Sequence, residues 1–307
     1  MRTLILGAGG TGGYFGARLL ESGADVTFLV RPGRAELLKQ HGLIVRSQFG
    51  DFQSKELSLC NKAESEFDLI VLSCKAYDLE SSMDAIAGAV GSGTTILPIL
   101  NGMAHFEKLQ DRFGSEKILG GLCIISSTIG ESGEIRHLND THTLKYGEFN
   151  GGLSERVKNI DAMFKRANFV SIASERISQD IWEKWVMISS LAALTTLMRG
   201  NIGQVVSSPG GSAFGENLLA ECFAVLKANG QELRQAFVES NHARLKDEQS
   251  TLAASMLRDM ESGGRVEADQ IIGDLIKRAE AKQIETPNLQ IAYCNLKVYE
   301  LKRGSNL

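Results

Sequence analysis

Residues 3–12, with the sequence Thr-Leu-Ile-Leu-Gly-Ala-Gly-Gly-Thr-Gly, decide the fold. The apolar run Thr3–Leu6 is typical of a short buried parallel strand, and it ends directly in glycines. Thr11–Leu20 then has a helical pattern, and Gly23 follows where a left-handed C-cap is favoured. A strand, a glycine turn and a helix in this order predict the start of a doubly wound α/β sheet.

The turn between this strand and this helix fits the pattern G-x-G-x-x-G. The first glycine of such a pattern makes the tight turn, the second lets the main chain touch a pyrophosphate, and the third allows close packing of the helix on the strand. The phosphates then meet free N–H groups at the positive end of the helix dipole. Because the turn lies between a strand and a helix, it predicts a dinucleotide site rather than a turn that binds nothing. The predicted cofactor-binding residues of the turn are Gly7, Ala8, Gly9, Gly10, Thr11 and Gly12.

The first half of the chain continues to alternate strands and helices, which predicts a mostly parallel sheet. The predicted strands are Asp25–Val30, Asp68–Ser73 and Thr94–Leu100, and the predicted helices are Glu36–Gln40, Tyr77–Val90 and Ala104–Phe113. From Ile118 to Gly147 the segments are β-rich and separated by Gly and Asn turns. We therefore expect an antiparallel extension of the sheet there.

The second half is predominantly helical, apart from a short strand predicted at Phe169–Ile172. The predicted helices are Ser178–Met198, Ala213–Glu232, His242–Glu261, Asp269–Ala281 and Asn288–Lys302. Thr286-Pro287 is a good start for the last of them, because it supplies an N-cap followed by proline in the first turn. The sequence therefore predicts a Rossmann-type domain over residues 1–174 and an all-α domain over residues 175–307.

Composition excludes several classes of protein. The chain has 307 residues, of which 43% are hydrophobic and 23% charged, and its formal charge of −4 gives no reason to expect a nucleic-acid partner. Its five scattered cysteines form no CxxC pair and suggest reduced thiols in a cytoplasmic protein. The five histidines fit no metal-ligand spacing, so no metal is predicted. The uncharged stretches 85–106 and 185–198 are too rich in glycine or too short to cross a bilayer, so we expect no membrane partner.

The end of the second predicted strand indicates which dinucleotide binds. An NAD site places Asp or Glu there to accept from the ribose 2′-OH. This strand instead ends in Arg31, with Arg34 close behind, and Asp25 stands at its leading end. An arginine can hold a 2′-phosphate through paired, charge-assisted hydrogen bonds, although a solvated loop arginine is the commoner case. The sequence favours NADP over NAD.

Three further segments, together with the glycine turn and Arg31, resemble the ketopantoate reductase (2-dehydropantoate 2-reductase) family. They are Leu72-Ser73-Cys74-Lys75-Ala76, Leu100-Asn101-Gly102-Met103 and Ile181-Trp182-Glu183-Lys184-Trp185. The resemblance continues through residues 254–259 and 266–269, so it spans nearly the whole chain. It implies an NADPH-dependent reductase of a 2-oxo acid, with an active site between a Rossmann domain and a helical domain.

The resemblance also assigns roles to residues outside the turn. Lys184 matches the catalytic lysine, whose ammonium would donate a proton to the alkoxide formed by hydride transfer. Asn101 matches an asparagine that contacts both cofactor and substrate. The remaining matches are Lys75, Ser126 and Glu267 on the cofactor and Ser255 and Asn201 on the substrate. Without the family, Lys184 would be a surface lysine, Asn101 a turn residue and Ser255 a helix serine bonded to its own backbone.

One departure from the family concerns the helix that carries Lys184. The family has substrate-binding asparagines four and eight residues after the lysine, on the same helix face, whereas this chain has Ile188 and Ala192. An apolar side chain cannot hydrogen-bond a hydroxyl or a carboxylate. Ketopantoate is therefore the first substrate to test, and a family member with a less polar substrate is the alternative.

The sequence leaves two further hypotheses about the function. One is another hydroxy-acid dehydrogenase with a preference for NAD, against which Arg31 argues. The other is an NADP-binding sensor with weak catalysis, which only the loss of the two asparagines favours. The oligomeric state is not determined by the sequence, although the helical domain could supply a homodimer interface.

Overall fold

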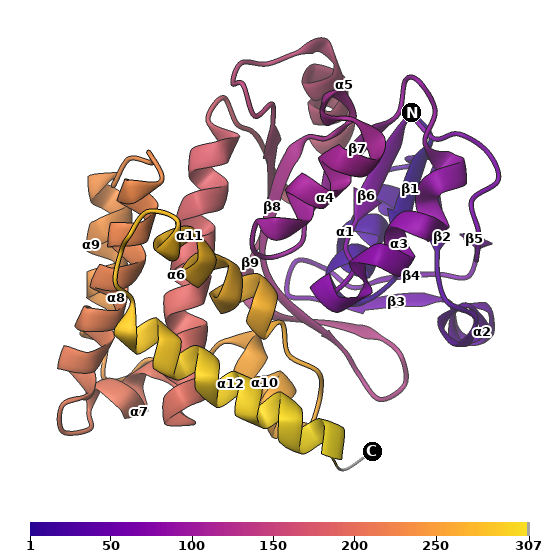
Figure 1. Cartoon of the computed structure of the whole chain (residues 1–307). Coiled ribbons are helices and arrows are strands. Elements are labelled where there is room, and N and C mark those ends of the chain that lie inside the picture. The colour runs from indigo at the N-terminus through magenta and orange to yellow at the C-terminus, as the bar shows by residue number, and fades with distance from the viewer. Residues whose placement is uncertain (306–307) are drawn as a thin grey trace. The chain divides into compact units, whose positions relative to one another are not determined.

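A computed structural model describes residues 1–305 of the chain, which divide into two compact units (Figure 1). The first unit comprises residues 1–100 and 105–178, and the second comprises residues 101–104 and those from 179 onward. The short segment 101–104 follows the last strand of the main sheet and groups with the helical unit.

The main sheet of the first unit is fully parallel and has the order β5-β2-β1-β6-β7. Its strands are β1 Thr3–Leu6, β2 Val26–Leu29, β5 Ser58–Cys60, β6 Leu69–Leu72 and β7 Thr95–Pro98. Every residue of β1, β6 and β7 is buried, as expected for short apolar strands covered on both faces. The chain builds outward from β1 to β2 and β5 on one side, and then to β6 and β7 on the other.

Helices surround this sheet, and a second, mixed sheet extends the unit. The helices are α1 Gly10–Glu21, α2 Pro32–His41, η1 Ala76–Asp78, α3 Leu79–Ile86, η2 Ala87–Ala89, α4 Ala104–Phe113, η3 Ser115–Lys117 and α5 Glu155–Phe164. The second sheet contains β3 Leu43–Arg46, β4 Phe52–Ser54, β8 Gly120–Ile129, β9 Ile135–Gly147 and β10 Val170–Ala173. β8 and β9 form the expected antiparallel pair, but they belong to this second sheet and do not extend the main one.

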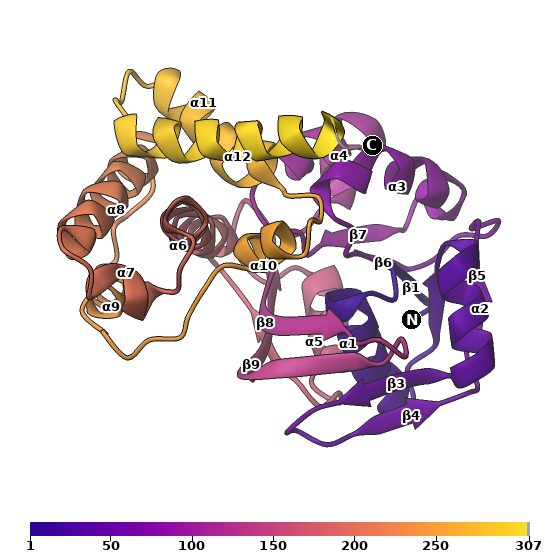
Figure 2. The same ribbon diagram turned by 90° about the horizontal axis from the view of Figure 1, so that it is seen from below.

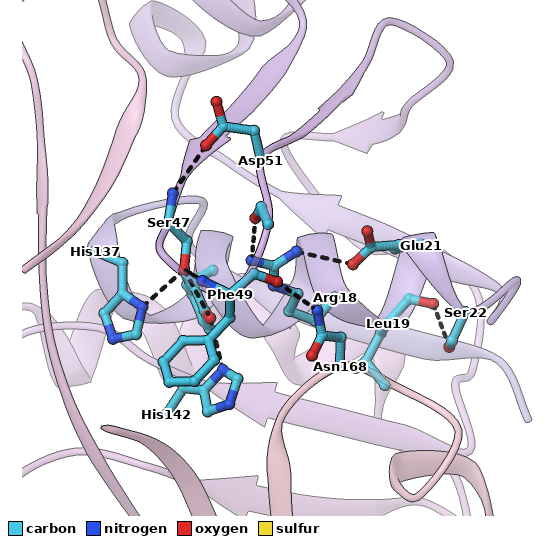
Figure 3. A network of polar contacts seen from close by, with 12 residues as sticks. Arg18, Leu19, Glu21, Ser22, Ser47, Phe49, Asp51, His137, His142 and Asn168 are labelled. Atoms are coloured by element: carbon cyan, nitrogen blue, oxygen red, sulfur yellow. Dashed lines mark hydrogen bonds and ion pairs between the residues drawn. The ribbon is translucent and has the colours of Figure 1, made fainter. Parts of the chain in front are cut away.

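A network of polar contacts joins α1 to the loop between β3 and β4 (Figure 3). The guanidinium of Arg18, which is fully buried, donates to the Gly50 carbonyl at 2.6 Å and pairs with Glu21. Ser47 Oγ lies 2.9 Å from His137 Nδ1, and the Phe49 ring stacks on the His142 ring with 3.9 Å between centroids. These contacts hold the loop against the side of α1 that faces away from the main sheet.

The second unit is a helical bundle arranged around α6, which Figure 2 shows end-on among its neighbours. Its helices are α6 Ile177–Met198, α7 Ile202–Val206, α8 Gly211–Ala228, α9 Gln235–Arg244, α10 Ser255–Glu261, the π-helical turn η4 Asp269–Gly273, α11 Asp274–Glu280 and α12 Pro287–Ser305. Trp185, Val186 and Leu194 of α6 lie in one continuous apolar core with α8, α11 and α12. Among the described residues, no helix is long and apolar enough to cross a membrane.

The fold class predicted from the sequence is confirmed, but the helix predicted over His242–Glu261 is wrong. α9 ends at Arg244 and α10 begins at Ser255. Asp247 Oδ1 accepts from the Gln249 N–H at 3.0 Å, and this local bond competes with a helix. The extended segment that follows donates no helical bonds and instead pairs its carbonyls with the start of α7, where Gly203 N–H bonds to Ser250 O at 2.9 Å.

Candidate active site

The glycine turn follows β1 and opens α1. Gly7 has a φ of +91°, which residues with a side chain rarely adopt. A Cβ at Gly12 would lie 2.0 Å from Ser73 Oγ and 2.4 Å from the Gly7 carbonyl oxygen, so only glycine allows α1 to approach the strands this closely. A Cβ at Gly9 would meet no atom within 4 Å. The fold therefore requires glycine at positions 7 and 12, whereas the space beside Gly9 is open to a ligand.

The N-terminus of α1 lacks a capping side chain. Gly9 is the N-cap residue, no side chain accepts from the first turn, and that turn contains no acidic residue. The first N–H groups of a helix have no acceptor within the helix, and they form the positive end of its dipole. The start of α1 therefore fits an anionic group such as a pyrophosphate.

The ends of the parallel strands bring the other predicted cofactor residues of the first unit to the same edge. Leu6 pairs in register with Leu29 and with Leu72, so β1, β2 and β6 end level with one another. Arg31 and Lys75 follow two and three residues after those ends. This edge, outside the carboxyl ends of strands whose connections run in opposite directions, is where doubly wound sheets bind their ligands.

Arg31 is accessible, and its partner is a carboxylate that the sequence analysis did not single out. Its side chain is 72% exposed, and Nη2 lies 2.9 Å from Asp78 Oδ1. An ion pair this exposed contributes little, so it does not prevent the guanidinium from binding a phosphate. Lys75 is the N-cap residue of η1, the short helix to which Asp78 belongs.

Arg34 contacts the glycine turn through a hydrogen bond to its main chain. Its Nε donates to the Ala8 carbonyl at 2.9 Å, and Nη1 donates to the Gly133 carbonyl at 2.7 Å. Nη2 is buried and has no hydrogen-bond partner, and burial lowers the pKa of Arg34 from its ordinary value. Because both acceptors are neutral carbonyls, they do not neutralise the positive charge of Arg34. An anionic ligand bound at the turn would complement this charge.

Ser126 lies in β8, which passes next to the turn. A Cβ at Gly10 would come within 2.8 Å of the Ser127 carbonyl oxygen, and the β8–β9 register is irregular between Ile125 and Ser127. The Ser126 N–H donates to Asn139 Oδ1 at 2.7 Å. The resemblance predicts that the cofactor contacts the main chain at Ser126, and because the N–H is bonded to Asn139, that contact would use the carbonyl group.

In the second unit, the structure brings Lys184 and Asn101 together. Lys184 Nζ on α6 donates to Asn101 Oδ1 at 2.8 Å, although 83 residues separate them in the sequence. Both side chains are half-buried. Lys184 is therefore not the solvated surface lysine that its position on a helix would suggest without the family resemblance.

A π-helical turn fixes the surroundings of this pair. Gln270 in η4 is 8% exposed, and its Nε2 donates to the Asn101 carbonyl at 2.9 Å. The Ile271 carbonyl accepts from Trp185 Nε1 and from Ser189 Oγ, both at 2.9 Å. π-Helical turns leave carbonyls free for such contacts and are frequent at functional sites. Sequence reasoning missed Gln270, because an isolated glutamine in an apolar segment gives no signal.

The other predicted substrate and cofactor residues of the second unit occupy different settings. Ser255 is exposed at the first residue of α10, and Glu267 is half-buried just before η4. Asn201 is the N-cap of α7, where its Oδ1 accepts from the Gln204 N–H at 2.9 Å in a capping box. Its side-chain oxygen thus has a structural role as a helix cap.

The two positions that depart from the family also differ from each other. Ala192 is 3% exposed and belongs to the apolar core, so its side chain faces other core residues. Ile188 is only partly buried and packs at the edge of that core.

Within the described residues, no group of three or more potential ligands could hold a metal ion.

A parallel nucleotide-binding sheet with this turn, together with a lysine positioned by an asparagine, defines a dinucleotide-dependent oxidoreductase. The sequence matches the family described as ketopantoate reductase PanE/ApbA over residues 3–151, and the C-terminal part of that family over residues 176–300. The chain therefore belongs to the ketopantoate reductase family. The predicted family, oxidoreductase class and NADP(H) cofactor are confirmed.

Three similar proteins illustrate the range of the family. An uncharacterized oxidoreductase, YkpB, of Bacillus subtilis is 35% identical over 99% of this chain and 100% of its own length. A 2-dehydropantoate 2-reductase of Nostoc sp. is 25% identical over 95% of this chain and 93% of its own. The crystal structure of a 2-dehydropantoate 2-reductase from Geobacter metallireducens has a TM-score of 0.89 at 27% identity and covers 97% of this chain and 99% of its own.

Proposed function

We propose that this protein reduces a 2-oxo acid to a 2-hydroxy acid with NADPH, and that 2-dehydropantoate, which would give pantoate, is the first substrate to test. The observation that carries the proposal is the hydrogen bond between Lys184 and Asn101. The names of the Nostoc and Geobacter relatives support the choice of substrate. The five scattered cysteines, which form no CxxC pair, support a cytoplasmic setting.

The first unit would hold the cofactor. The open main chain at Gly9 and the uncapped start of α1 would bind the pyrophosphate, and the exposed Arg31 would bind the 2′-phosphate. NADPH supplies, when bound, a hydride for the carbonyl carbon of the substrate. A carboxylate of the kind that accepts from a free ribose 2′-OH is absent from the end of β2, which favours the phosphorylated cofactor.

Lys184 would act as the general acid. As the carbonyl carbon gains a hydride, its oxygen becomes an alkoxide, and the ammonium of Lys184 donates a proton to that oxygen to complete the hydroxyl group. The same positive charge stabilises the developing alkoxide before the proton moves. Asn101 orients Nζ through the 2.8 Å hydrogen bond, and Gln270 in turn fixes the main chain of Asn101.

Replacement of Lys184 tests this mechanism. We expect Lys184→Ala to lower kcat by about a hundred- to ten-thousand-fold, which is the usual contribution of a general acid, while the Kd for NADPH stays within a factor of about two. The rate is measured from NADPH consumption, and Lys227→Ala, an exposed lysine at the end of α8, is the matched control. Turnover that survives Lys184→Ala would refute the assigned role.

A second candidate is a reductase of less polar 2-oxo acids, and the apolar, partly accessible Ile188 favours it. Ile188 lies one helical turn after Lys184 on the same face of α6, where it offers a substrate contact but no hydrogen bond. A panel of 2-oxo acids with polar and apolar side chains separates the candidates through kcat/KM. A higher kcat/KM for apolar substrates than for 2-dehydropantoate would favour the second candidate.

A further inference from the structure

The second unit contains a hollow that the proposed reaction does not use. It is bounded by α6, α7, α8 and α9 and spans about 350 Å³ together with the solvent at its open mouth, of which only about 20 Å³ is open to the centre of a water-sized molecule. Its wall is mainly aliphatic and includes Met187, Leu191, Leu194, Ile202, Leu218 and Leu252. Figure 2 shows α7, α8 and α9 on one side of α6. A concave, apolar hollow with few polar groups is the usual form of a small-molecule site.

The polar members of the wall include Arg244 and Asn241, both from the last turns of α9. Asn241 is 4% exposed, its Nδ2 donates to the Phe237 carbonyl at 2.8 Å, and its Oδ1 accepts from Arg244 Nη1 at 3.1 Å. Both ends of the Asn241 amide are thus engaged, and they set the orientation of the guanidinium. Asn241 is a buried support for Arg244 rather than a free ligand group.

Arg244 is a half-buried cation with no carboxylate partner. Over residues 1–305 no ion pair to Arg244 is formed, and the nearby carboxylate of Glu216 instead lies 2.6 Å from His242 Nδ1. Asp247, three residues after Arg244, accepts from the Gln249 N–H. Burial lowers the pKa of Arg244 from its ordinary value, because its charge is only partly solvated. A desolvated charge without a counter-ion is unfavourable, and an anionic ligand would relieve this.

We propose that this hollow binds an aliphatic carboxylate, with the carboxylate on the Arg244 guanidinium and the alkyl chain against the Leu and Ile side chains of α6, α7 and α8. A guanidinium presents parallel N–H donors that match the two oxygens of a carboxylate. The aliphatic wall selects an alkyl chain rather than a polar one, because each buried methylene contributes through the hydrophobic effect. The observations behind this site are separate from those behind the proposed reaction, although Met187 and Leu191 follow Lys184 by three and seven residues on α6.

Calorimetric titration of the full-length protein with butyrate, hexanoate and octanoate tests the contact between the hollow and the alkyl chain of the ligand. We expect the affinity to rise about fourfold for each methylene that becomes buried, which corresponds to about 0.8 kcal/mol, until the hollow is full. Octanol and octylamine, which have the chain without the carboxylate, are expected to bind at least tenfold more weakly than octanoate. No binding of octanoate at millimolar concentration, or equal binding of octanol, would overturn the proposal.

Two variants test the assignment to this hollow. Arg244→Gln removes the charge and is expected to weaken octanoate binding by at least tenfold, whereas Lys246→Gln removes an exposed charge two residues away and is expected to leave binding unchanged. Gly215→Ala keeps Arg244 but adds a methyl group 3.1 Å from Leu245 Cδ2 and 3.6 Å from Leu194 Cδ2, which narrows the hollow. We expect this variant to bind butyrate as tightly as the native protein does. Hexanoate and octanoate should gain less affinity over butyrate than they do in the native protein.

The fold of each variant is checked separately from ligand binding. Unchanged NADPH binding and an unchanged thermal unfolding midpoint show that a loss of octanoate binding is local. If Arg244→Gln lowers the midpoint, Gly215→Ala and the wild-type chain-length series decide the question on their own. Octanoate binding that is equal in wild type, Arg244→Gln and Gly215→Ala would show that the carboxylate binds elsewhere, and would refute the site.

Discussion

At the scale of single residues, the three glycines of the G-x-G-x-x-G turn have different physical reasons to be glycine. Gly7 needs its positive φ, and Gly12 needs the absence of a Cβ beside Ser73. Gly9 needs neither, because a Cβ there would point into open space. A glycine that the protein alone does not require is explained most simply by the close approach of a ligand.

Alanine substitutions at Gly9 and Gly12 separate these reasons. We expect Gly9→Ala to leave the free energy of unfolding nearly unchanged, but to raise the Kd for NADPH at least tenfold, because the methyl group occupies space that the pyrophosphate needs. Gly12→Ala should destabilise the protein itself by about 1–3 kcal/mol, since the added atom would lie within 2.4 Å of main chain. Urea unfolding measures the free energy of unfolding of both variants, and titration measures their Kd for NADPH. Equal destabilisation by the two substitutions would contradict this interpretation.

The candidate site illustrates how far residues can be assigned from sequence alone. Lys184 and Asn101 could be predicted, because short motifs around each resemble a family, and the structure places them 2.8 Å apart. Gln270 could not, since its contact with Asn101 spans 169 residues and depends on a π-helical turn that no local pattern marks. Asn201 matches the family in position, but a helix cap is an equally good reason for an asparagine there.

At the scale of secondary-structure elements, the buried strands and long helices could be predicted, and the short elements could not. β1, β6 and β7 are fully buried and mainly apolar, whereas β3, β4 and β5, which are as short or shorter, carry polar side chains and are only partly buried. The break between α9 and α10 depends on a side-chain hydrogen bond of Asp247 and on pairing of the following segment with α7. Tertiary contacts of this kind outweigh helix propensity.

His142 of β9, which stacks on Phe49 of the β3–β4 connection, gives a prediction about pH. Desolvation lowers the pKa of His142 from its ordinary value, with further contributions from His137 and Arg18 (Figure 3). The unfolded chain therefore binds a proton near pH 6.5 that the folded chain does not yet bind. Stability contributed by the neutral imidazole is complete above about pH 6.5 and is lost as the pH falls toward the lower folded-state pKa.

We expect replacement of His142 by Gln to flatten this part of the stability profile. Urea unfolding at about pH 5.5 and 7.5 measures the difference for each protein. His41→Gln, at an exposed position at the end of α2, is the control and should keep the native pH dependence. A His142→Gln variant whose stability falls on acidification as steeply as that of the native chain would show that other groups are responsible.

At the scale of the whole molecule, each unit has its own apolar core and its own chemistry. The first core surrounds the parallel sheet and α1, and the second surrounds α6. The groups proposed to bind the phosphates belong to the first unit, whereas the proposed general acid belongs to the second. Binding of the cofactor and turnover of the substrate are therefore separable properties, and each can be removed by substitutions within one unit.

Coenzyme preference provides the corresponding test on the intact chain. A ligand that binds only the folded state stabilises it, by about 2.7 kcal/mol at a concentration of 100 times its Kd. We expect NADPH to raise the thermal unfolding midpoint more than NADH does at equal concentration, because only NADPH carries the 2′-phosphate that Arg31 can bind. Arg31→Ala should weaken NADPH binding at least tenfold and leave NADH binding nearly unchanged. Since Arg31 is 72% exposed, the free variant should be as stable as the native protein, and the exposed Arg46→Ala provides a control. If NADPH and NADH raise the unfolding midpoint of the native protein equally, the assignment of Arg31 is wrong. That result would favour an NAD-dependent dehydrogenase, in which the Asp78 carboxylate accepts from the ribose hydroxyl.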